Sequence, residues 1–184
     1  MGKNKNVLLL VEAAIFAAIA VVLSLLPTNF GASLTISLGM VPLTILSLKR
    51  GFKWGLFCGF LWGLLHFPLG NVYFLSVSQV LIEYILAFAF GGFAGLMSER
   101  FYQSENKAWP LILATFIGTF ARFFWHFVAG YIYWGSYAPE GMSPLVFSFI
   151  MNGASALLTS FASAIILILV YQAAPRLFDR KLYR

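Results

Sequence analysis

The sequence predicts an all-α integral membrane protein, folded as a compact bundle of six transmembrane helices. Of its 184 residues, 61% are hydrophobic and only 10% are charged, whereas soluble domains carry about 25% charged residues. Each crossing of a bilayer needs about 20 mostly apolar residues. The length therefore accommodates a single transmembrane domain over residues 1–184. The only cysteine, Cys58, can form no intrachain disulfide.

Prolines, glycines and charged residues divide the apolar sequence into six segments. The predicted helices span residues 7–26, 37–48, 54–67, 75–98, 109–135 and 145–173. The second segment is short for a full crossing, and it contains Pro42. These two features favour a bent, tilted or partly re-entrant segment.

The basic residues predict that both termini are cytoplasmic. All Lys and Arg residues except Arg122 lie before the first segment, after the last one, or in the connections 49–53 and 99–108. Such residues accumulate on the cytoplasmic side of membrane proteins. The formal net charge of +6 then describes a basic rim along the lipid bilayer, which requires no nucleic-acid partner.

Ionisable residues inside the predicted helices are the main indication of a functional site. Glu83 lies in the fourth segment, and Arg122 and His126 lie in the fifth. Each costs several kcal/mol in the membrane unless it faces a cavity or finds a partner. We expect Glu83 and Arg122 to lie at comparable depth and to form an ion pair. This pair serves either to fix the helix register or to build a binding site.

Four residues of the fifth segment form a stripe along one helix face. Arg122, His126, Gly130 and Trp134 recur every four residues over about 18 Å, from the middle of the membrane to its outer surface. We interpret the stripe as an access path. Gly130 leaves space for a flat molecule between His126 and Trp134. An interfacial aromatic belt is the alternative reading of Trp134.

Further polar and aromatic residues are expected at the same depth. They are Trp62, Tyr73, Tyr84 and Asn152. A carboxylate, an amide, an imidazole and aromatic faces together suit a cationic heteroaromatic ligand. We expect no catalytic residues and no metal ligands. An intramembrane hydrolase would need a nucleophile with a base, and Ser33 has no recognisable partner.

Small residues on the first segment form two overlapping pairs, Ala13 with Ala17 and Ala14 with Ala18. Such pairs allow two helices to approach closely. The sequence leaves two interpretations open, which are packing inside the bundle and docking on a separate membrane partner.

Longer motifs carry a family resemblance. The stretches RFFWHFVAGYIYWGSYAPEGMSP, SFIMNG, LIEYILAFAFGGFAGL and EAAIFAAIA resemble the thiamine-binding S-components (the ThiT family) of energy-coupling factor vitamin transporters. The resemblance extends over nearly the whole chain. It implies a six-helix protein of the bacterial cytoplasmic membrane that captures thiamine from outside. It also implies docking, through the alanines of the first helix, on a transmembrane coupling subunit with two ATPase subunits. The chain itself would be no enzyme, and only its partners would use ATP.

The resemblance also implies roles for individual residues. Glu83 would accept hydrogen bonds from the aminopyrimidine, Arg122 would orient Glu83, and His126 and Trp134 would stack on the thiazolium. The remaining ligand contacts that it implies are Trp62, Tyr73, Tyr84 and Asn152.

Several positions depart from the family pattern. Arg122 stands where a lysine is usual, and these two side chains differ in geometry. Thr35, Gly39 and Phe147 stand where tryptophan, glutamate and tyrosine are expected. Fewer polar and aromatic contacts predict weaker thiamine binding, or binding of a related pyrimidine or thiazole.

Two other functions remain open at this point. A stand-alone, ion-coupled secondary transporter of a small cationic heterocycle would show ion-dependent uptake without an ATPase partner. A purely structural membrane subunit would bind no small molecule.

Overall fold

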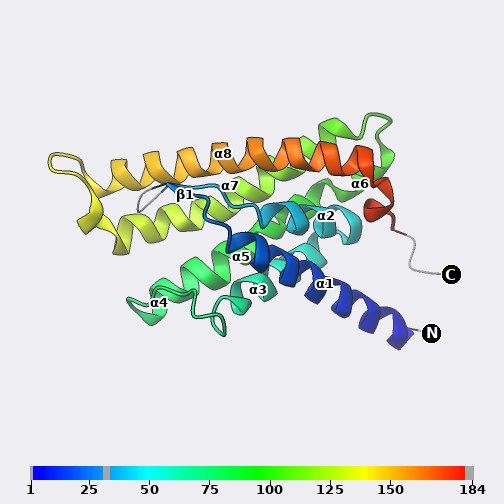
Figure 1. The fold of residues 1–184 in the computed structure, drawn as a ribbon, viewed down its shortest axis with the longest axis horizontal. Coiled ribbons are helices and arrows are strands. Elements are labelled where there is room, and N and C mark those ends of the chain that lie inside the picture. The colour runs from blue at the N-terminus through cyan, green and yellow to red at the C-terminus, as the bar shows by residue number, and fades with distance from the viewer. Residues whose placement is uncertain (1, 31–33, 181–184) are drawn as a thin grey trace.

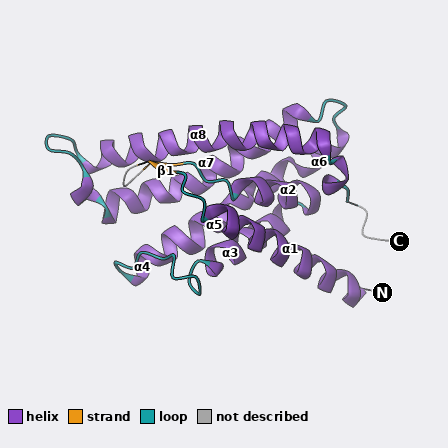
Figure 2. Cartoon of the chain, viewed as in Figure 1, coloured by secondary structure: helices purple, strands orange, loops and turns teal. Residues whose placement is uncertain are grey.

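The part of the chain that the structure describes contains six main helical segments, as the sequence predicted (Figure 1). The computed structural model describes residues 2–30 and 34–180. The segments are α1 (Gly2–Ser24), α2 (Met40–Arg50), α3 (Phe52–Leu65), a composite fourth helix (Val77–Gln103), α7 (Ala108–Tyr133) and α8 (Pro144–Ala173). Most of the described chain is helical, with loops mainly at the ends of the bundle (Figure 2). The fourth helix continues past the predicted end at residue 98.

The composite fourth helix departs from α-helical geometry at two places. Its parts are α4 (Val77–Val80), the π-helical turn η1 (Leu81–Leu86), α5 (Ala87–Phe90), the 3-10 helix η2 (Gly91–Met97) and α6 (Ser98–Gln103). Short π-helical turns inside longer helices occur frequently at functional sites. The turn η1 contains Glu83 and Tyr84.

Among the described residues, four helices are long and apolar enough to cross a membrane: Asn6–Ser24, Val77–Gln103, Ala108–Tyr133 and Pro144–Ala173. By contrast, the eleven residues of α2 rise only about 16 Å, against a hydrocarbon core of about 30 Å. Every residue from Met40 to Leu48 is buried. The second segment is therefore a short helix enclosed by the others. Pro42 lies in its first turn, where the missing N–H costs no helical hydrogen bond.

An extended stretch leads into α2. Strand β1 (Asn29–Phe30) pairs antiparallel with β2 (Leu34–Thr35). The N–H of Thr35 then donates to Ser155 Oγ, and the N–H of Ser37 donates to Thr159 Oγ1, each at 3.0 Å. Non-helical backbone is tolerated at membrane depth only where protein groups satisfy it. Hydroxyls of α8 do so here.

Glycines bring α3 and the fourth helix into backbone contact. A Cβ atom on Gly63 would lie 1.7 Å from the carbonyl oxygen of Tyr84. One on Gly59 would lie 2.2 Å from that of Phe88, and one on Gly92 would lie 2.2 Å from the carbonyl carbon of Gly55. No other residue type fits at such distances. These contacts fix the depth of Tyr84 and of its neighbour Glu83 in the bundle.

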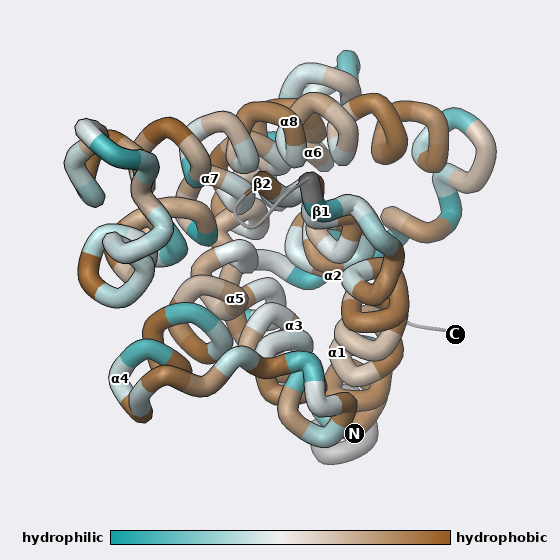
Figure 3. Tube along the Cα trace, turned by 60° about the vertical axis from the view of Figure 1, so that its left-hand side comes forward, coloured by the Kyte–Doolittle hydropathy of each residue, from teal (hydrophilic) through white to brown (hydrophobic). Residues whose placement is uncertain are grey.

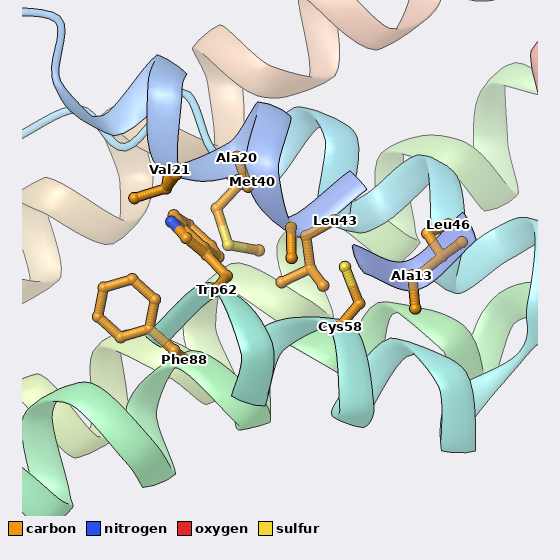
Figure 4. Close-up of a cluster of buried hydrophobic side chains, with 10 residues drawn as sticks. Ala13, Ala20, Val21, Met40, Leu43, Leu46, Cys58, Trp62 and Phe88 are labelled. Atoms are coloured by element: carbon orange, nitrogen blue, oxygen red, sulfur yellow. The ribbon is translucent and has the colours of Figure 1, made fainter. Parts of the chain in front are cut away.

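The core between α1, α2 and α3 surrounds Trp62 (Figure 4). Its members include Ala13, Ala17, Leu43 and Cys58, all fully buried. The two alanine pairs predicted on α1 therefore differ. Ala13 and Ala17 pack inside the bundle, whereas Ala14 and Ala18 are exposed.

Both termini lie at the same end of the bundle, and the α3–α4 and α7–α8 connections lie at the opposite end (Figure 1). Hydrophilic residues gather mainly at helix ends and connections, whereas α1 and α8 are largely hydrophobic (Figure 3). Ion pairs at the terminal end join Lys49 and Arg50 to Glu12, and Arg180 to Glu99. We call this the basic end. That it faces the cytoplasm stays a prediction.

Candidate ligand-binding site

A cavity of about 530 Å³ has a lining that includes Tyr73 and Tyr137, which lie in the connections at the end opposite the termini (Figure 1). Its lining combines the extended stretch before α2 with the fourth helix, α7 and α8. The volume lies within the range of small-molecule sites. The structure brings together these predicted site residues on its wall: Tyr73, Glu83, Tyr84, Arg122, His126, Gly130, Trp134 and Asn152.

Glu83 is held in place by two side-chain donors. Trp134 Nε1 donates to one carboxylate oxygen at 2.6 Å, and Gln79 Nε2 donates to the other. Gln79 is itself fully buried, and its Oε1 accepts from the N–H of Leu75 at 3.1 Å. Each carboxylate oxygen retains a free lone pair for a ligand. The supporting role of Gln79 was missed from the sequence, although its i, i+4 spacing to Glu83 was visible.

The expected ion pair between Glu83 and Arg122 is wrong. Glu83 lies six residues from Val77, about 9 Å along its helix from the end opposite the termini, whereas Arg122 lies eleven residues, about 17 Å, from Tyr133 at the same end of the bundle. The two residues therefore differ in depth. The Arg122 guanidinium packs over the ring of Phe88, 4.3 Å from its centroid.

Trp62 does not line the cavity, contrary to the prediction. It is fully buried, and its Nε1 donates to Ser24 Oγ at 3.0 Å. Figure 4 shows it between Val21 of α1 and Phe88 of α5. Apolar residues face both the lipid and the core in a membrane protein, so sequence alone did not reveal the direction of this ring.

Gly130 serves helix packing more than ligand space. A Cβ atom there would lie 2.3 Å from Ser148 Oγ and 3.1 Å from Asn152 Nδ2. Ser148 Oγ donates to the carbonyl of Phe127 at 2.8 Å, and Asn152 Nδ2 donates to the carbonyl of Ser148 at 3.0 Å. The missing side chain lets α8 approach α7 and brings Asn152 to the cavity wall.

Aromatic rings form the part of the wall near the α3–α4 and α7–α8 connections. The Trp134 ring lies 5.0 Å from Tyr73 and 5.5 Å from Tyr137, measured between centroids. The N–H of Tyr73 donates to the hydroxyl of Tyr84 at 3.0 Å. Tyr137 also lines the cavity. Trp134 therefore belongs to the wall of the cavity, and an interfacial aromatic belt is not its only role.

His126 lies one turn from Arg122 on α7, and its Nε2 has no hydrogen-bond partner among the described residues.

Two of the positions that depart from the family pattern, Thr35 and Phe147, also line the cavity. Gly39 does not, because Trp62 occupies the space beside it. Ser33 lies outside the described residues. Within residues 2–30 and 34–180, no three His, Cys, Asp or Glu side chains converge as a metal site would require.

Comparisons with known proteins agree with this architecture. Residues 10–179 match the family model described as thiamine transporter protein (Thia_YuaJ). Two relatives are named thiamine transporter ThiT. The one from Lacticaseibacillus paracasei is 33% identical over 98% of this chain and 95% of its own length. The one from Bacillus subtilis is 32% identical over 96% of this chain and 97% of its own length.

A solved structure of ThiT from Listeria monocytogenes superposes with a TM-score of 0.92. It is 44% identical and covers 95% of this chain and 99% of that one. The family match over residues 10–179 includes every residue that lines the cavity and reaches all six helical segments. The chain therefore belongs to the thiamine transporter protein family of multi-pass membrane proteins, whose members are not enzymes.

Proposed function

We propose that this chain captures thiamine in the outer cavity and delivers it as the substrate-binding S-component of an energy-coupling factor importer. The observation that carries the proposal is the Glu83 carboxylate, oriented by Trp134 and Gln79 at the wall of a cavity of about 530 Å³. A fixed carboxylate in a partly dry site attracts a cationic ligand more strongly than one in water.

Thiamine has two rings, and the cavity offers a place for each. The aminopyrimidine donates hydrogen bonds to Glu83, with Tyr84 and Asn152 as further polar contacts. Because Trp134 Nε1 donates to the same carboxylate, we place the Trp134 ring beside the aminopyrimidine, whereas the resemblance implied that it stacks on the thiazolium. The cationic thiazolium lies deeper, against the ring of His126, where aromatic faces attract positive charge. Because the donors and acceptors are held before binding, less ordering accompanies capture of the ligand.

Fluorescence of Trp134 provides the direct test. Titration of the detergent-purified protein with thiamine should change the emission, its pyrimidine moiety should bind more weakly, and unrelated vitamins should have no effect. Trp134→Phe should remove most of the signal, whereas Trp109→Phe, at an exposed ring on the basic end, should keep it. Unchanged emission with thiamine in folded protein would contradict the proposal.

Delivery requires a partner, and α1 offers a surface for it. Ala14 and Ala18 are exposed and lie one turn apart. Exposed apolar side chains flank them, including Val11 and Ile15, which are 52% and 54% exposed. Small residues on an apolar face allow close contact with another membrane helix. We assign this face to the transmembrane coupling subunit, whose two ATPase subunits supply the energy.

The two alanine pairs give a matched experiment. Ala14→Leu and Ala18→Leu should abolish uptake in cells with the full importer, while purified protein still binds thiamine. Ala13→Leu and Ala17→Leu should instead destabilise the fold, because both positions are fully buried. Normal uptake by both exposed-face variants would exclude docking at this face. Thiamine uptake by the isolated chain in liposomes, driven by an ion gradient alone, would favour the secondary transporter.

A further inference from the structure

The connection between α3 and the fourth helix, residues 66–76, exposes a run of apolar side chains. The exposed apolar residues of this connection and of the first position of α4 include Phe67, Leu69, Phe74, Leu75 and Val77. Phe74 and Val77 are 65% and 67% exposed. None of these five side chains lines the cavity. Contiguous exposed apolar side chains mark contact with a partner or a membrane.

The sequence around this connection lacks charge. No Asp, Glu, Lys or Arg occurs between Lys53, near the start of α3, and Glu83 on the fourth helix. The α7–α8 connection, by contrast, contains the exposed carboxylate of Glu140. Charged side chains are costly inside a bilayer and common in connections that face water. The composition of the α3–α4 connection is therefore that of the membrane helices on either side of it.

The glycine contacts of α3 fix the level of the connection in the bundle. Gly63 lies against the carbonyl oxygen of Tyr84, and Gly59 lies against that of Phe88. The end of α3 at Leu65 is therefore level with η1, several residues inside the fourth helix. The connection then runs beside α4 and not beyond it. Figure 1 shows that the α7–α8 connection extends farther along the long axis of the bundle.

Helix lengths place this level near the boundary of the hydrocarbon core. Val77 lies 22 residues from Glu99, a charged residue at the basic end of the same helix, which corresponds to about 33 Å. The 14 residues of α3 rise about 21 Å. The hydrocarbon core is about 30 Å thick. Both lengths place the connection at this boundary or just inside it.

Polar groups of the connection are directed toward the protein. Asn71 and Tyr73 line the cavity. The N–H of Tyr73 donates to the hydroxyl of Tyr84 at 3.0 Å, and the N–H of Leu75 donates to Gln79 Oε1 at 3.1 Å. Non-helical backbone at membrane depth is tolerated where protein groups satisfy it. The connection thus has a polar side at the cavity and an apolar side directed away from it.

We propose that residues 66–77 form a lipid-contacting lip beside the cavity. Their apolar side chains insert among the lipid acyl chains of the leaflet at the end opposite the termini. The partner is lipid and not a protein subunit, because the missing charges, the depth and the inward polar groups are together properties of a membrane-embedded segment. The lip supports the cavity wall at Tyr73 from the lipid side. The inference holds for any ligand and does not depend on the proposed function.

Fluorescence of an attached probe tests the proposal. Phe74→Cys and Glu140→Cys are each labelled with an NBD maleimide and placed in nanodiscs of phosphatidylcholine and phosphatidylglycerol. Native Cys58 is fully buried and stays unlabelled. Phosphatidylcholine with a doxyl spin label near the headgroup should quench the probe at position 74 at least about twofold more than the probe at position 140, because the first lies inside the bilayer. Iodide in the buffer should quench the two probes in the opposite order.

The position of the doxyl group adds a measurement of depth. A doxyl group near the chain end should quench the probe at position 74 less than one near the headgroup, because the lip lies close to the membrane boundary. If labelled Phe74→Cys does not fold, Val77→Cys, at a similarly exposed side chain, takes its place. Folded protein whose probe is quenched by neither doxyl lipid would overturn the proposal, whether water or a protein subunit covers this face. Stronger quenching by the chain-end label would overturn the assigned depth.

Discussion

The side chains at the cavity wall are oriented by contacts with neighbouring residues. The Glu83 carboxylate receives Trp134 on one oxygen and Gln79 on the other, so its direction is set before a ligand arrives. Arg122 is held by aromatic faces and not by Glu83. Loss of the Glu83 charge therefore leaves the environment of Arg122 unchanged. This separates the binding role of Glu83 from any role in folding.

Glu83→Gln should weaken thiamine binding roughly ten- to hundredfold, because a hydrogen bond to a charged group contributes about 1.5–3 kcal/mol. Thermal stability should stay near wild type, since no ion pair with Arg122 is broken. Glu140→Gln removes the same charge from an exposed loop and should leave affinity unchanged. Fluorescence titration and thermal unfolding measure both properties. A large loss of stability in Glu83→Gln would argue for a structural role.

Helices meet in this protein through small residues and hydroxyls. Gly55, Gly59 and Gly63 recur every four residues on α3 and place it against the fourth helix. Gly130 does the same for α7 against α8. With lipid tails as apolar as leucine, close packing and hydrogen bonds drive helix association. The spacing of the helices around the cavity therefore depends on individual glycines, at which a side chain would push the helices apart.

Gly130→Ala should destabilise the protein by about 1–3 kcal/mol, since the new Cβ would lie 2.3 Å from Ser148 Oγ. The affinity for thiamine should fall as well, because Asn152 lies against the same contact. Gly153→Ala on α8 is the matched control, with nothing within 4 Å of its Cβ. It should be neutral or stabilising by up to about 1 kcal/mol. Equal thermal unfolding of the two variants would show that α7 and α8 separate without cost.

Hydroxyls of α8 replace helical hydrogen bonds for the extended stretch before α2. Thr159→Val keeps the side-chain shape but leaves the N–H of Ser37 unpaired, which should cost about 1–3 kcal/mol. Ser160→Ala removes a buried hydroxyl that has no partner among the described residues, so stability should be unchanged or higher. Thermal unfolding distinguishes the two, and a reversed order would contradict the assigned roles.

The whole molecule is asymmetric along its long axis. One end holds the cavity mouth with aromatic rings, and the other holds linked ion pairs. There, Glu12 pairs with Lys49 and Arg50, and Arg50 Nη1 donates to the carbonyl of Arg180 at 2.8 Å. Arg180 in turn pairs with Glu99 on the fourth helix, which raises the pKa of Arg180. This network ties α1, α2, the fourth helix and the C-terminal segment together at the basic end.

Because basic residues accumulate on the cytoplasmic side, this asymmetry predicts that the basic end faces the cytoplasm and the cavity end faces outside. A cysteine at position 140 should react with a membrane-impermeant maleimide added to intact cells, whereas one at position 105 should react only after the cells are opened. Both positions are exposed. Native Cys58 is fully buried and should stay unlabelled in either case. Labelling of position 105 in intact cells would reverse the topology.

The sequence by itself determined the class of protein, the six helices and most of the cavity wall. Composition, polar breaks and the placement of charges are properties of the chain that need no partner element. The intramembrane positions of Glu83, Arg122 and His126 marked a site because such groups are costly in lipid. The long motifs around residues 122–144 pointed to the family.

Only the tertiary structure decided which way side chains face and how deep they lie. It placed Trp62 and Ala13 in the core, left Ala14 exposed, and separated Arg122 from Glu83. In a soluble protein, the apolar face of a helix is the face that packs against the core. In a bilayer, lipid-facing and buried positions are both apolar. The hydrophobic periodicity therefore does not show which face of a transmembrane helix is turned toward the core. Relative depth likewise depends on where each helix starts and on backbone contacts between helices, which form only when the bundle assembles.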